Sequence, residues 1–489
     1  MTNLSGANLN NGAAVGPHGE GMDSLRNFPT YPEYKDSGVE WLGEVPEHWA
    51  VYPLKRAIER IESGTSVNAA DFPAEPGSLG VLKTSCVYTG KFDWTENKTV
   101  DDEDLSRVSC PLRKDTLIVS RMNTPDLVGA TGLVTEAPNG IFLPDRLWQV
   151  YFLVNHSPEF LFYFSKSREY REQVKMACSG TSASMQNLGQ DDFRGLLFAE
   201  PPKPEQTQIA RFLDHETARI DALIEEQQRL IELLKEKRQA VIAHAVTKGL
   251  DPTVPMKDSG VEWLGEVPAH WVVAGLKWFW SVTDCKHITA EFVDDGVPLA
   301  SIREVQCRYV SLENAKQTTE FFYRQLIEAG RKPVAGDLIF SRNATVGEVA
   351  QVADWHPPFA MGQDVCLLKK QFEWLSSDYL QAVLRSPVVA VQLDNLMIGS
   401  TFKRVNVEDI RGLVVPMPPE KEQQLIADYL NSETGQFDSL LAECQGTIGL
   451  LQERRSALIS AAVTGKIDVR GWQPPASTQA PESAVAEAV

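Results

Sequence analysis

The chain reads Lys35-Asp36-Ser37-Gly38-Val39-Glu40-Trp41-Leu42-Gly43-Glu44-Val45-Pro46-Glu47-His48-Trp49 near its start, and this stretch decides the architecture because it occurs twice. It returns 222 positions later as Lys257–Trp271, and the two copies differ only at Glu47 and Ala269. A second block, Pro201–Asp251, aligns without gaps on Pro418–Asp468, with 24 identities in 51 positions. Repeats of this length indicate that two copies of one frame make up the chain.

The frame encloses two long inserts, roughly residues 50–200 and 272–416, that share little sequence. What survives is Leu117–Arg121 against Leu338–Arg342, and Arg194-Gly195-Leu196 against Arg411-Gly412-Leu413. Two unlike inserts at equivalent positions of one frame indicate two equivalent tasks with different targets.

The second repeated block has the pattern of a long helix. No Pro or Gly occurs from Glu205 to Val246, and apolar residues return every seven positions, which is typical of a coiled coil. The heptad positions are Leu213, Ile220, Gln227, Leu234 and Val241 in the first copy, and Leu430, Phe437, Cys444, Leu451 and Leu458 in the second. Gly435, Gly446 and Gly449 are expected to weaken the second helix locally. Pseudo-twofold packing predicts that the two helices run antiparallel and form a rod.

The inserts show the mixed signals of an α+β fold. Strands are predicted at Thr116–Ser120, Gln149–Val154 and Asp364–Leu368, and a helix at Pro158–Ala177. The predicted fold is therefore two mixed α/β domains separated by two long antiparallel coiled-coil helices, with a pseudo-twofold internal repeat. The predicted division is a disordered tail at 1–30, the first insert with its preceding segment at 31–203, a helix at 204–250, the second insert with its preceding segment at 251–420, a helix at 421–466 and a disordered tail at 467–489.

Composition excludes several classes of protein. The 489 residues are 43% hydrophobic and 23% charged, as in ordinary globular proteins, and no apolar run approaches the ~20 residues of a membrane span. The first residues lack the pattern of a secretory signal, so a cytoplasmic location is expected. Seven cysteines lie far apart without a Cys-x-x-Cys pair, which argues against a zinc knuckle. A net charge of −19 disfavours nucleic acid as a partner of the isolated chain.

Catalytic motifs are missing from the sequence. There is no phosphate-binding loop, dinucleotide fingerprint, His-Glu-x-x-His or Gly-x-Ser-x-Gly, and no Asn-Pro-Pro-aromatic tetrapeptide of amino-methyltransferases. Gly180–Ser184 has no histidine nearby that could serve a nucleophile, and Glu313-Asn314-Ala315-Lys316 matches only a chance spacing of a nuclease motif. We therefore expect no catalytic site and no metal site in this chain.

His48-Trp49 and His270-Trp271 are the most conspicuous repeated pairs. A metal role would need converging ligands, and the neighbouring residues are apolar instead. A packing role in the frame is favoured, with a contact to a partner protein as the alternative. The residues assigned to the frame or to a partner interface are Trp41, His48, Trp49, Trp263, His270, Trp271, Leu213, Ile220, Leu234, Leu430, Phe437 and Leu451.

Polar loops at matching places in both inserts are candidates for DNA contacts. A guanidinium and an amide follow equivalent strands, and these are groups that read guanine and adenine edges. A second pair of loops combines glycine, small hydroxyls and longer polar side chains, which suits phosphates and bases. The candidates are Arg121, Asn123, Thr124, Thr181, Ser182, Gln186 and Asn187 in the first insert, and Arg342, Asn343, Thr345, Ser400, Thr401, Lys403 and Arg404 in the second. Ordinary surface turns are the alternative for any single residue.

The frame resembles the DNA-specificity subunit of Type I restriction-modification systems. The resemblance rests on Tyr34–Gly43 with Pro46-x-His48-Trp49, on the Pro-Pro-x-x-Glu-Gln that opens each long helix, and on Ala245–Gly249 at its end, and it covers about residues 31–470. It implies a non-catalytic subunit whose two target-recognition domains each read half of a bipartite site in double-stranded DNA. It also implies two adenine methyltransferase subunits and two restriction and translocase subunits as partners, with S-adenosylmethionine, ATP and Mg²⁺ held by those partners.

Two other readings stay open. One is a protein-interaction scaffold on the same frame whose inserts do not read DNA. The other is a stand-alone enzyme with an unrecognised site. The target bases and the length of the spacer between the half-sites do not follow from the sequence.

Overall fold

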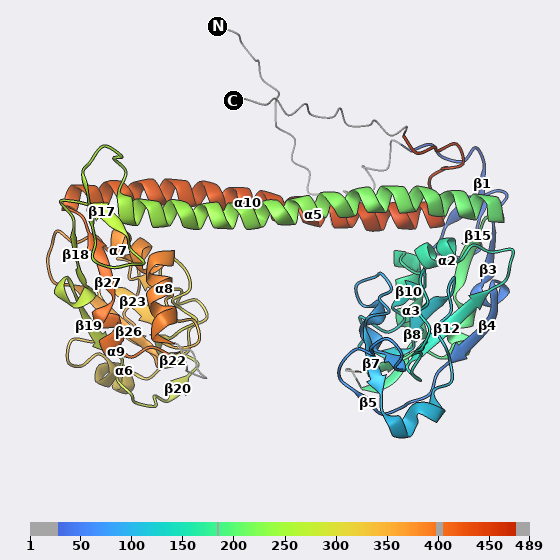
Figure 1. Ribbon diagram of the computed structural model, residues 1–489, viewed down its shortest axis with the longest axis horizontal. Coiled ribbons are helices and arrows are strands. Elements are labelled where there is room, and N and C mark those ends of the chain that lie inside the picture. The colour runs from blue at the N-terminus through green and yellow to red at the C-terminus, as the bar shows by residue number, and fades with distance from the viewer. Residues whose placement is uncertain (1–27, 183–184, 398–403, 476–489) are drawn as a thin grey trace, which may run out of the picture. The chain divides into compact units, whose positions relative to one another are not determined.

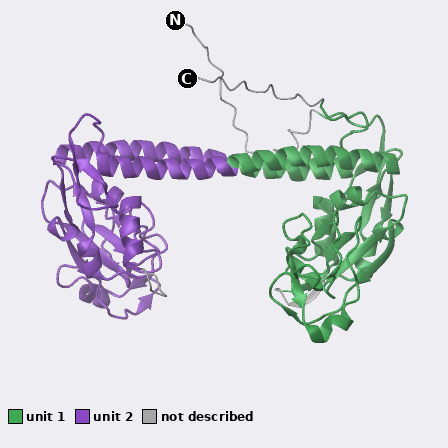
Figure 2. Cartoon of the chain, viewed as in Figure 1, with its two compact units in different colours: residues 1–227, 446–489 green, residues 228–445 purple. Residues whose placement is uncertain are grey.

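The structure is a computed structural model that describes residues 28–182, 185–397 and 404–475. The chain divides into two compact units, unit 1 with residues 1–227 and 446–489 and unit 2 with residues 228–445 (Figure 2). Each long helix contributes one part to each unit. None of the described helices is long and apolar enough to cross a membrane.

Unit 1 contains the first insert. Its elements are β1 (Tyr34–Asp36), β2 (Glu44–Pro46), β3 (Ala50–Pro53), β4 (Ile58–Ser63), β5 (Ala69–Ala70), β6 (Gly80–Leu82), β7 (Asn97–Val100), β8 (Leu117–Ser120), β9 (Met122–Asn123), β10 (Thr131–Leu133), β11 (Ile141–Phe142), β12 (Leu147–Phe152), α2 (Pro158–Phe164), α3 (Arg168–Ala177), β13 (Ser179–Ser182), β14 (Met185–Asn187), α4 (Gln190–Gly195), β15 (Leu197–Glu200) and the first part of α5 (Lys203–Lys248). One antiparallel sheet has the order β10-β8-β12-β4, and a second has the order β11-β6-β7-β5.

Unit 2 contains the second insert. Its elements are β16 (Met256–Asp258), β17 (Glu266–Pro268), β18 (Val272–Gly275), β19 (Trp280–Asp284), β20 (Phe292–Val293), β21 (Val297–Ala300), β22 (Gln317–Thr318), α6 (Glu320–Leu326), β23 (Leu338–Ser341), β24 (Val349–Gln351), β25 (Ala360–Met361), β26 (Val365–Lys370), α7 (Ser377–Leu384), α8 (Pro387–Leu396), α9 (Val407–Gly412), β27 (Val414–Met417) and the first part of α10 (Glu420–Val463). The sheets β24-β23-β26-β19 and β25-β21-β22-β20 match those of unit 1 strand for strand.

The inserts thus share a topology that their sequences hardly show. In both units the second sheet contains one parallel pair, β6 with β11 and β21 with β25. In both units the segment after the last strand of the four-stranded sheet forms a helix that lies against the long helices, α2 in unit 1 and α7 in unit 2 (Figure 1). Tyr163 of α2 donates to Asp214 of α5. The Tyr379 hydroxyl of α7 donates to the Pro416 carbonyl at 2.9 Å and lies 3.5 Å from the Val246 carbonyl of α5. The strands and helices predicted from sequence therefore belong to one repeated architecture.

The predicted helix at Pro158–Ala177 is wrong in one respect, because it is two helices. α2 ends at Phe164 and α3 begins at Arg168. Ser167 caps α3 by accepting a hydrogen bond from the Tyr170 amide at 3.2 Å. A serine at a helix N-cap favours a non-helical backbone at that position, so the preceding helix ends before it. The apolar residues of 158–177 therefore belong to two helices, although their pattern along the sequence is continuous.

The structure contains two long helices, α5 and α10, which run antiparallel within each unit. Arg455 of α10 pairs with Asp221 of α5 in unit 1, with Nε and Oδ1 2.8 Å apart. The repeat-related residues Arg238 and Asp438 pair in unit 2, with Nη2 and Oδ1 3.6 Å apart. Both ion pairs fit one register of the two helices, which is the register that an internal twofold repeat requires.

The predicted seam of the helices is largely buried. Leu213, Ile220, Leu430 and Phe437 are buried, whereas Leu234 and Leu451 are half-buried. The three glycines of the second helix do not interrupt it, because α10 is continuous from Glu420 to Val463. A helical glycine costs only ~1 kcal/mol, which packing against α5 offsets.

The two lead segments, residues 31–49 and 253–271, contain the repeated stretch, and each holds the beginning of a long helix through one carboxylate. Glu205 accepts hydrogen bonds from Trp49 Nε1 at 3.1 Å and from Tyr31 Oη at 2.5 Å, and His48 Nε2 lies 2.8 Å away. Burial and this carboxylate raise the pKa of Tyr31, which therefore keeps its proton. Trp49 is fully buried here, whereas the His48 side chain is 41% exposed.

Unit 2 repeats this arrangement with one difference. Glu422 accepts from Trp271 Nε1 at 2.8 Å and lies 2.6 Å from His270 Nε2. The side chain of Glu422 is 38% exposed, whereas that of Glu205 is 7% exposed. No counterpart of Tyr31 bonds Glu422 in the described chain.

The same lead segments also receive the end of a long helix. Lys466 donates to the carbonyls of Leu42 and Glu44, and Lys248 donates to the carbonyl of Glu266. The preceding turn requires glycine, because Gly465 has φ +74° and a Cβ there would lie 2.4 Å from Pro46. Each lead segment therefore joins the end of one long helix to the beginning of the other.

The bounds of the two predicted tails need correction. The prediction of disorder from residue 467 is wrong for residues 467–472, because Ile467 and Val469 are buried and Trp472 packs on Phe212. Phe28, which was assigned to the first tail, also packs on Phe212. The rest of the predicted tails, 1–27 and 476–489, lies outside the described residues.

Candidate nucleic-acid interface

In unit 1 the two predicted polar loops come together as neighbouring strands. β9 follows the buried strand β8, and β14 lies beside it with Gln186 opposite Asn123 and Asn187 opposite Met122. The Leu188 amide donates to the Arg121 carbonyl at 2.8 Å. Residues that are about 65 positions apart in the sequence thus form one surface.

Unit 2 joins its two loops in the same way. Asn343 and Arg404 form an isolated antiparallel bridge, and the Val405 amide donates to the Arg342 carbonyl at 2.9 Å. This bond is the counterpart of the one between Leu188 and Arg121. One main-chain scaffold therefore presents different side chains in the two units.

The individual side chains of unit 1 differ in what they can reach. Arg121 is half-buried and its Nε donates to the Asp145 carbonyl at 2.7 Å, whereas Thr124 is exposed. Asn123 is buried, and its amide donates to the hydroxyl of Tyr88 at 2.7 Å. Tyr88, which the sequence did not single out, is exposed, so Asn123 positions this ring at the surface rather than contacting a base itself.

Arg342 is the clearest error among the predicted contacts. Its side chain is 4% exposed and its Nη2 lies 2.7 Å from Asp284 Oδ1. A buried guanidinium that is already paired with a carboxylate cannot reach a base edge. Asn343, Thr345 and Arg404 are more accessible, and Arg404 is 51% exposed with its Nη2 3.8 Å from Asp364.

The burial of Arg342 gives a prediction about stability. Arg342→Ala leaves Asp284 without its cation and is expected to destabilise unit 2 by about 1–3 kcal/mol. Hydrogen exchange of peptides from β19 and β23 measures this change. The matched variant Arg404→Ala, at an exposed position on the same surface, should stay within about 0.5 kcal/mol. Equal protection in both variants would show that Arg342 does not hold this sheet together.

Some predicted residues cannot be placed. Ser400, Thr401 and Lys403 lie outside the described residues, and Thr181 and Ser182 are described only as backbone of β13.

Asp364 was missed by the sequence analysis. It adopts φ 64° immediately before β26, and its position beside Arg404 depends on this turn.

A possible metal cluster lies beside Arg342 but is poorly suited to an ion. The ligand atoms of Asp284, Cys285 and His287 lie within 4.8 Å of one another. Asp284 is already paired with Arg342, and burial raises the pKa of the Cys285 thiol, which disfavours the thiolate that binds metal.

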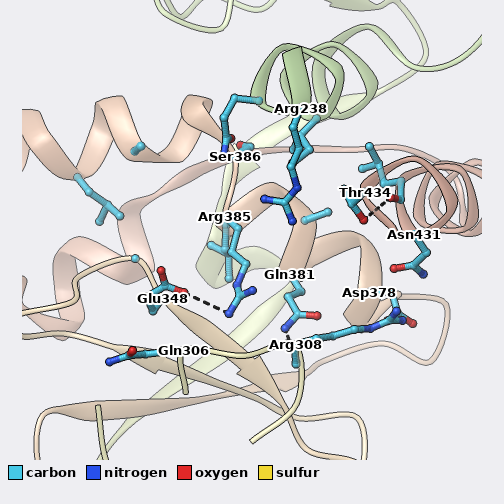
Figure 3. A pocket seen from close by; sticks show the side chains of 18 of the residues that line it. Arg238, Gln306, Arg308, Glu348, Asp378, Gln381, Arg385, Ser386, Asn431 and Thr434 are labelled. Atoms are coloured by element: carbon cyan, nitrogen blue, oxygen red, sulfur yellow. Dashed lines mark hydrogen bonds and ion pairs between the residues drawn. The ribbon is translucent and has the colours of Figure 1, made fainter. Parts of the chain in front are cut away.

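A groove of about 730 Å³ separates the second insert from the long helices (Figure 3). Its three arginines come from α5, from the insert and from the end of α7, but each is paired with an acid. Arg238 pairs with Asp438, Arg308 with Asp378 and Arg385 with Glu348. The groove therefore offers little free positive charge for phosphates, and the joined loops are the better candidate for the interface.

Comparisons with known proteins find similar sequences and similar folds. The family description "Type I restriction modification DNA specificity domain" matches residues 306–440. A putative type I restriction enzyme MjaX specificity subunit from Methanocaldococcus jannaschii is 22% identical over 443 residues, which cover 88% of this chain and 96% of that protein. By sequence the chain is thus similar, over most of its length, to a specificity subunit of a type I restriction enzyme.

Other relatives extend the comparison. The EcoKI specificity subunit from Escherichia coli is 22% identical, with 88% of this chain and 91% of that protein covered. The HsdS subunit from Thermoanaerobacter tengcongensis has a similar fold, with a TM-score of 0.51, 17% identity, and coverage of 86% of this chain and 98% of that chain. A chain from a structure of a type I R-M system reaches a TM-score of 0.65 at 16% identity, with the same coverage. Both solved chains thus share the α+β fold of this chain.

Proposed function

We propose that this chain is a DNA-specificity subunit of a Type I restriction-modification system and recognises a bipartite, asymmetric DNA site, with each insert reading one half. The observation that carries the proposal is the pair of joined loops, which have the same backbone bond in both units but different side chains. A common scaffold with unlike side chains is what two readers of different sequences need.

The side chains carried by the joined loops suit base edges. Gln186 and Asn187 in unit 1, and Asn343 in unit 2, carry amides, which can pair with adenine in the major groove. Arg404 carries an exposed guanidinium, which can bond the two acceptors of guanine. Arg342 is excluded from this role because it is buried.

The partners in this proposal are two adenine methyltransferase subunits, which dock along the long helices, and two restriction and translocase subunits. S-adenosylmethionine, ATP and Mg²⁺ belong to those partners. A net charge of −19 on this chain implies that the partners supply many of the phosphate contacts. The isolated chain should therefore bind DNA weakly.

The test is a selection from a random DNA library with the chain assembled with its methyltransferase. Arg404→Ala should relax the sequence of one half-site and weaken binding about ten- to a hundredfold, because one base contact contributes ~1–3 kcal/mol. Gln186→Ala should relax the other half-site only. Arg324→Ala, which removes an exposed arginine on α6, serves as the control and should change neither.

Two outcomes would count against the proposal. A palindromic selected site would contradict two independent readers. An assembled complex that binds its methyltransferase but selects no DNA sequence would favour the scaffold. Detection of methylated adenine in the host genome, with the gene present and deleted, gives the same decision in the cell, because loss of a bipartite motif on deletion is expected.

A further inference from the structure

The two units differ at one place where the internal repeat would make them alike. This place is the exposed face at the beginning of the long helix, formed in unit 1 by Gln208 and Phe212 and in unit 2 by their counterparts Leu425 and Tyr429. Phe212 is fully buried, whereas Leu425 is 61% exposed and Tyr429 is 38% exposed. The same helix face is thus covered in one unit and open in the other.

In unit 1 the chain covers this face with its own two end segments. Trp472 and Phe28 pack edge-on against Phe212, with ring centroids 5.4 and 5.5 Å apart. Gln208 Nε2 donates to the carbonyls of Val469 and Trp472 at 3.2 and 2.6 Å. An extended segment with an aromatic anchor is therefore what this face accepts.

In unit 2 the counterpart of that covering segment runs directly into the next strand. The chain passes from Leu250 through residues 251–255 into β16, and Leu250 is 43% exposed where its counterpart Ile467 is 3% exposed. A groove of about 240 Å³ remains, lined by Leu250, Val254, Glu422 and Leu425 among others. Its floor is apolar because leucine replaces Gln208.

The charges at the rim of this groove indicate which kind of segment would bind there. In unit 1 Arg470 pairs with Asp468 and lies over the Tyr31 ring, with Cζ 4.8 Å from its centroid. In unit 2 the counterpart Asp251 accepts hydrogen bonds from Thr253 instead, and Glu422 is more exposed than Glu205. A basic residue next to the aromatic anchor would find two carboxylates here.

We propose that this groove of unit 2 binds an extended segment of the methyltransferase partner that carries an aromatic side chain beside a basic one. The inference rests on the proposed function for the identity of the partner. It adds that the two ends of the frame are not equivalent, because unit 1 supplies its own aromatic cover and unit 2 takes one from the partner.

The first experiment counts the methyltransferase subunits bound to the full chain by native mass spectrometry. Leu425→Gln combined with Tyr429→Ser should weaken binding of one subunit at least tenfold, so that the main species carries one subunit instead of two. Leu105→Gln is the matched control, since Leu105 is an exposed leucine of the first insert and does not lie on a long helix. It should leave both subunits bound.

A photo-crosslinking residue at position 425 identifies the occupant directly. The expected product joins position 425 to a methyltransferase peptide that contains an aromatic residue, whereas the same residue at position 208 should crosslink within the chain to residues 469–472. A crosslink from position 425 to a second copy of this chain would overturn the inference.

Failure of the inference and failure of the proposed function give different results. If the wild type and the double variant both bind two subunits, this inference alone is wrong. If the wild type binds no methyltransferase subunit, the proposed partner and this inference fall together.

Discussion

Trp49→Ala is expected to destabilise unit 1 by about 3–5 kcal/mol. Trp49 is fully buried in a core that contains residues from the lead segment, the first insert and both long helices. Its removal opens a large cavity and takes one hydrogen bond from the buried carboxylate of Glu205. The loss should extend to the beginning of α5 and to the end of α10, because both lie in this core.

The measurement has to resolve one part of the chain, since a protein with two compact units need not unfold in a single step. Hydrogen exchange followed by mass spectrometry gives the protection of peptides from α2 and from the beginning of α5. Trp41→Ala is the matched control, because Trp41 lies in the same lead segment but is 41% exposed. An equally small loss of protection in both variants would mean that Trp49 does not hold the frame.

Lengthening both long helices is expected to change the gap between the two DNA half-sites but not their sequences. Seven residues add ~10 Å of helix, which corresponds to about three base pairs of B-DNA. Binding to the original site should fall at least a hundredfold, because a site with the old gap can then satisfy only one reader at a time. The prediction extends the proposed function and requires that the helices set the spacing.

The register of the two ion pairs shows where to place the insertions. Seven residues are inserted between Gln227 and Gln228 in α5 and between Ile448 and Gly449 in α10, so that the two insertions lie opposite each other. Arg455 then still pairs with Asp221, and Arg238 with Asp438. Selection from a random library should return the same half-sites with a longer gap. Insertion into α5 alone, which breaks the register, is the control and should weaken all specific binding. A selected site with the original gap but with altered half-site bases would refute the prediction that the helices set the spacing.

The frame could be predicted because each of its sequence patterns occurs in both copies of the repeat. The heptads of Leu213 and Leu430 define helices that the structure contains with bounds shifted by one to three residues. The sequence singled out the His-Trp pairs, but it did not show which carboxylate they contact. Glu205 lies 156 residues from Trp49, and only the recurrence of both motifs in each copy could have suggested that they meet.

The candidate interface was predicted less well, for a reason visible at Arg342. The sequence shows that an arginine follows a buried strand, but whether its side chain points outward depends on Asp284, which lies on another strand of the same sheet. Likewise Asn123 donates to Tyr88 instead of facing solvent. Tertiary contacts decide which polar side chains of a loop remain available, and spacing along the chain does not record them.

The lead segments have a consequence for the course of the chain itself. Lys466 and Lys248 make matching contacts with the carbonyls of Glu44 and Glu266, so the end of the second long helix is joined to the first lead segment without a peptide link. The two junctions between a long helix and a lead segment are built alike, and a peptide link crosses only the one between α5 and the second lead segment. The contacts that hold the fold together are therefore the same at both junctions, whether or not a peptide link crosses them.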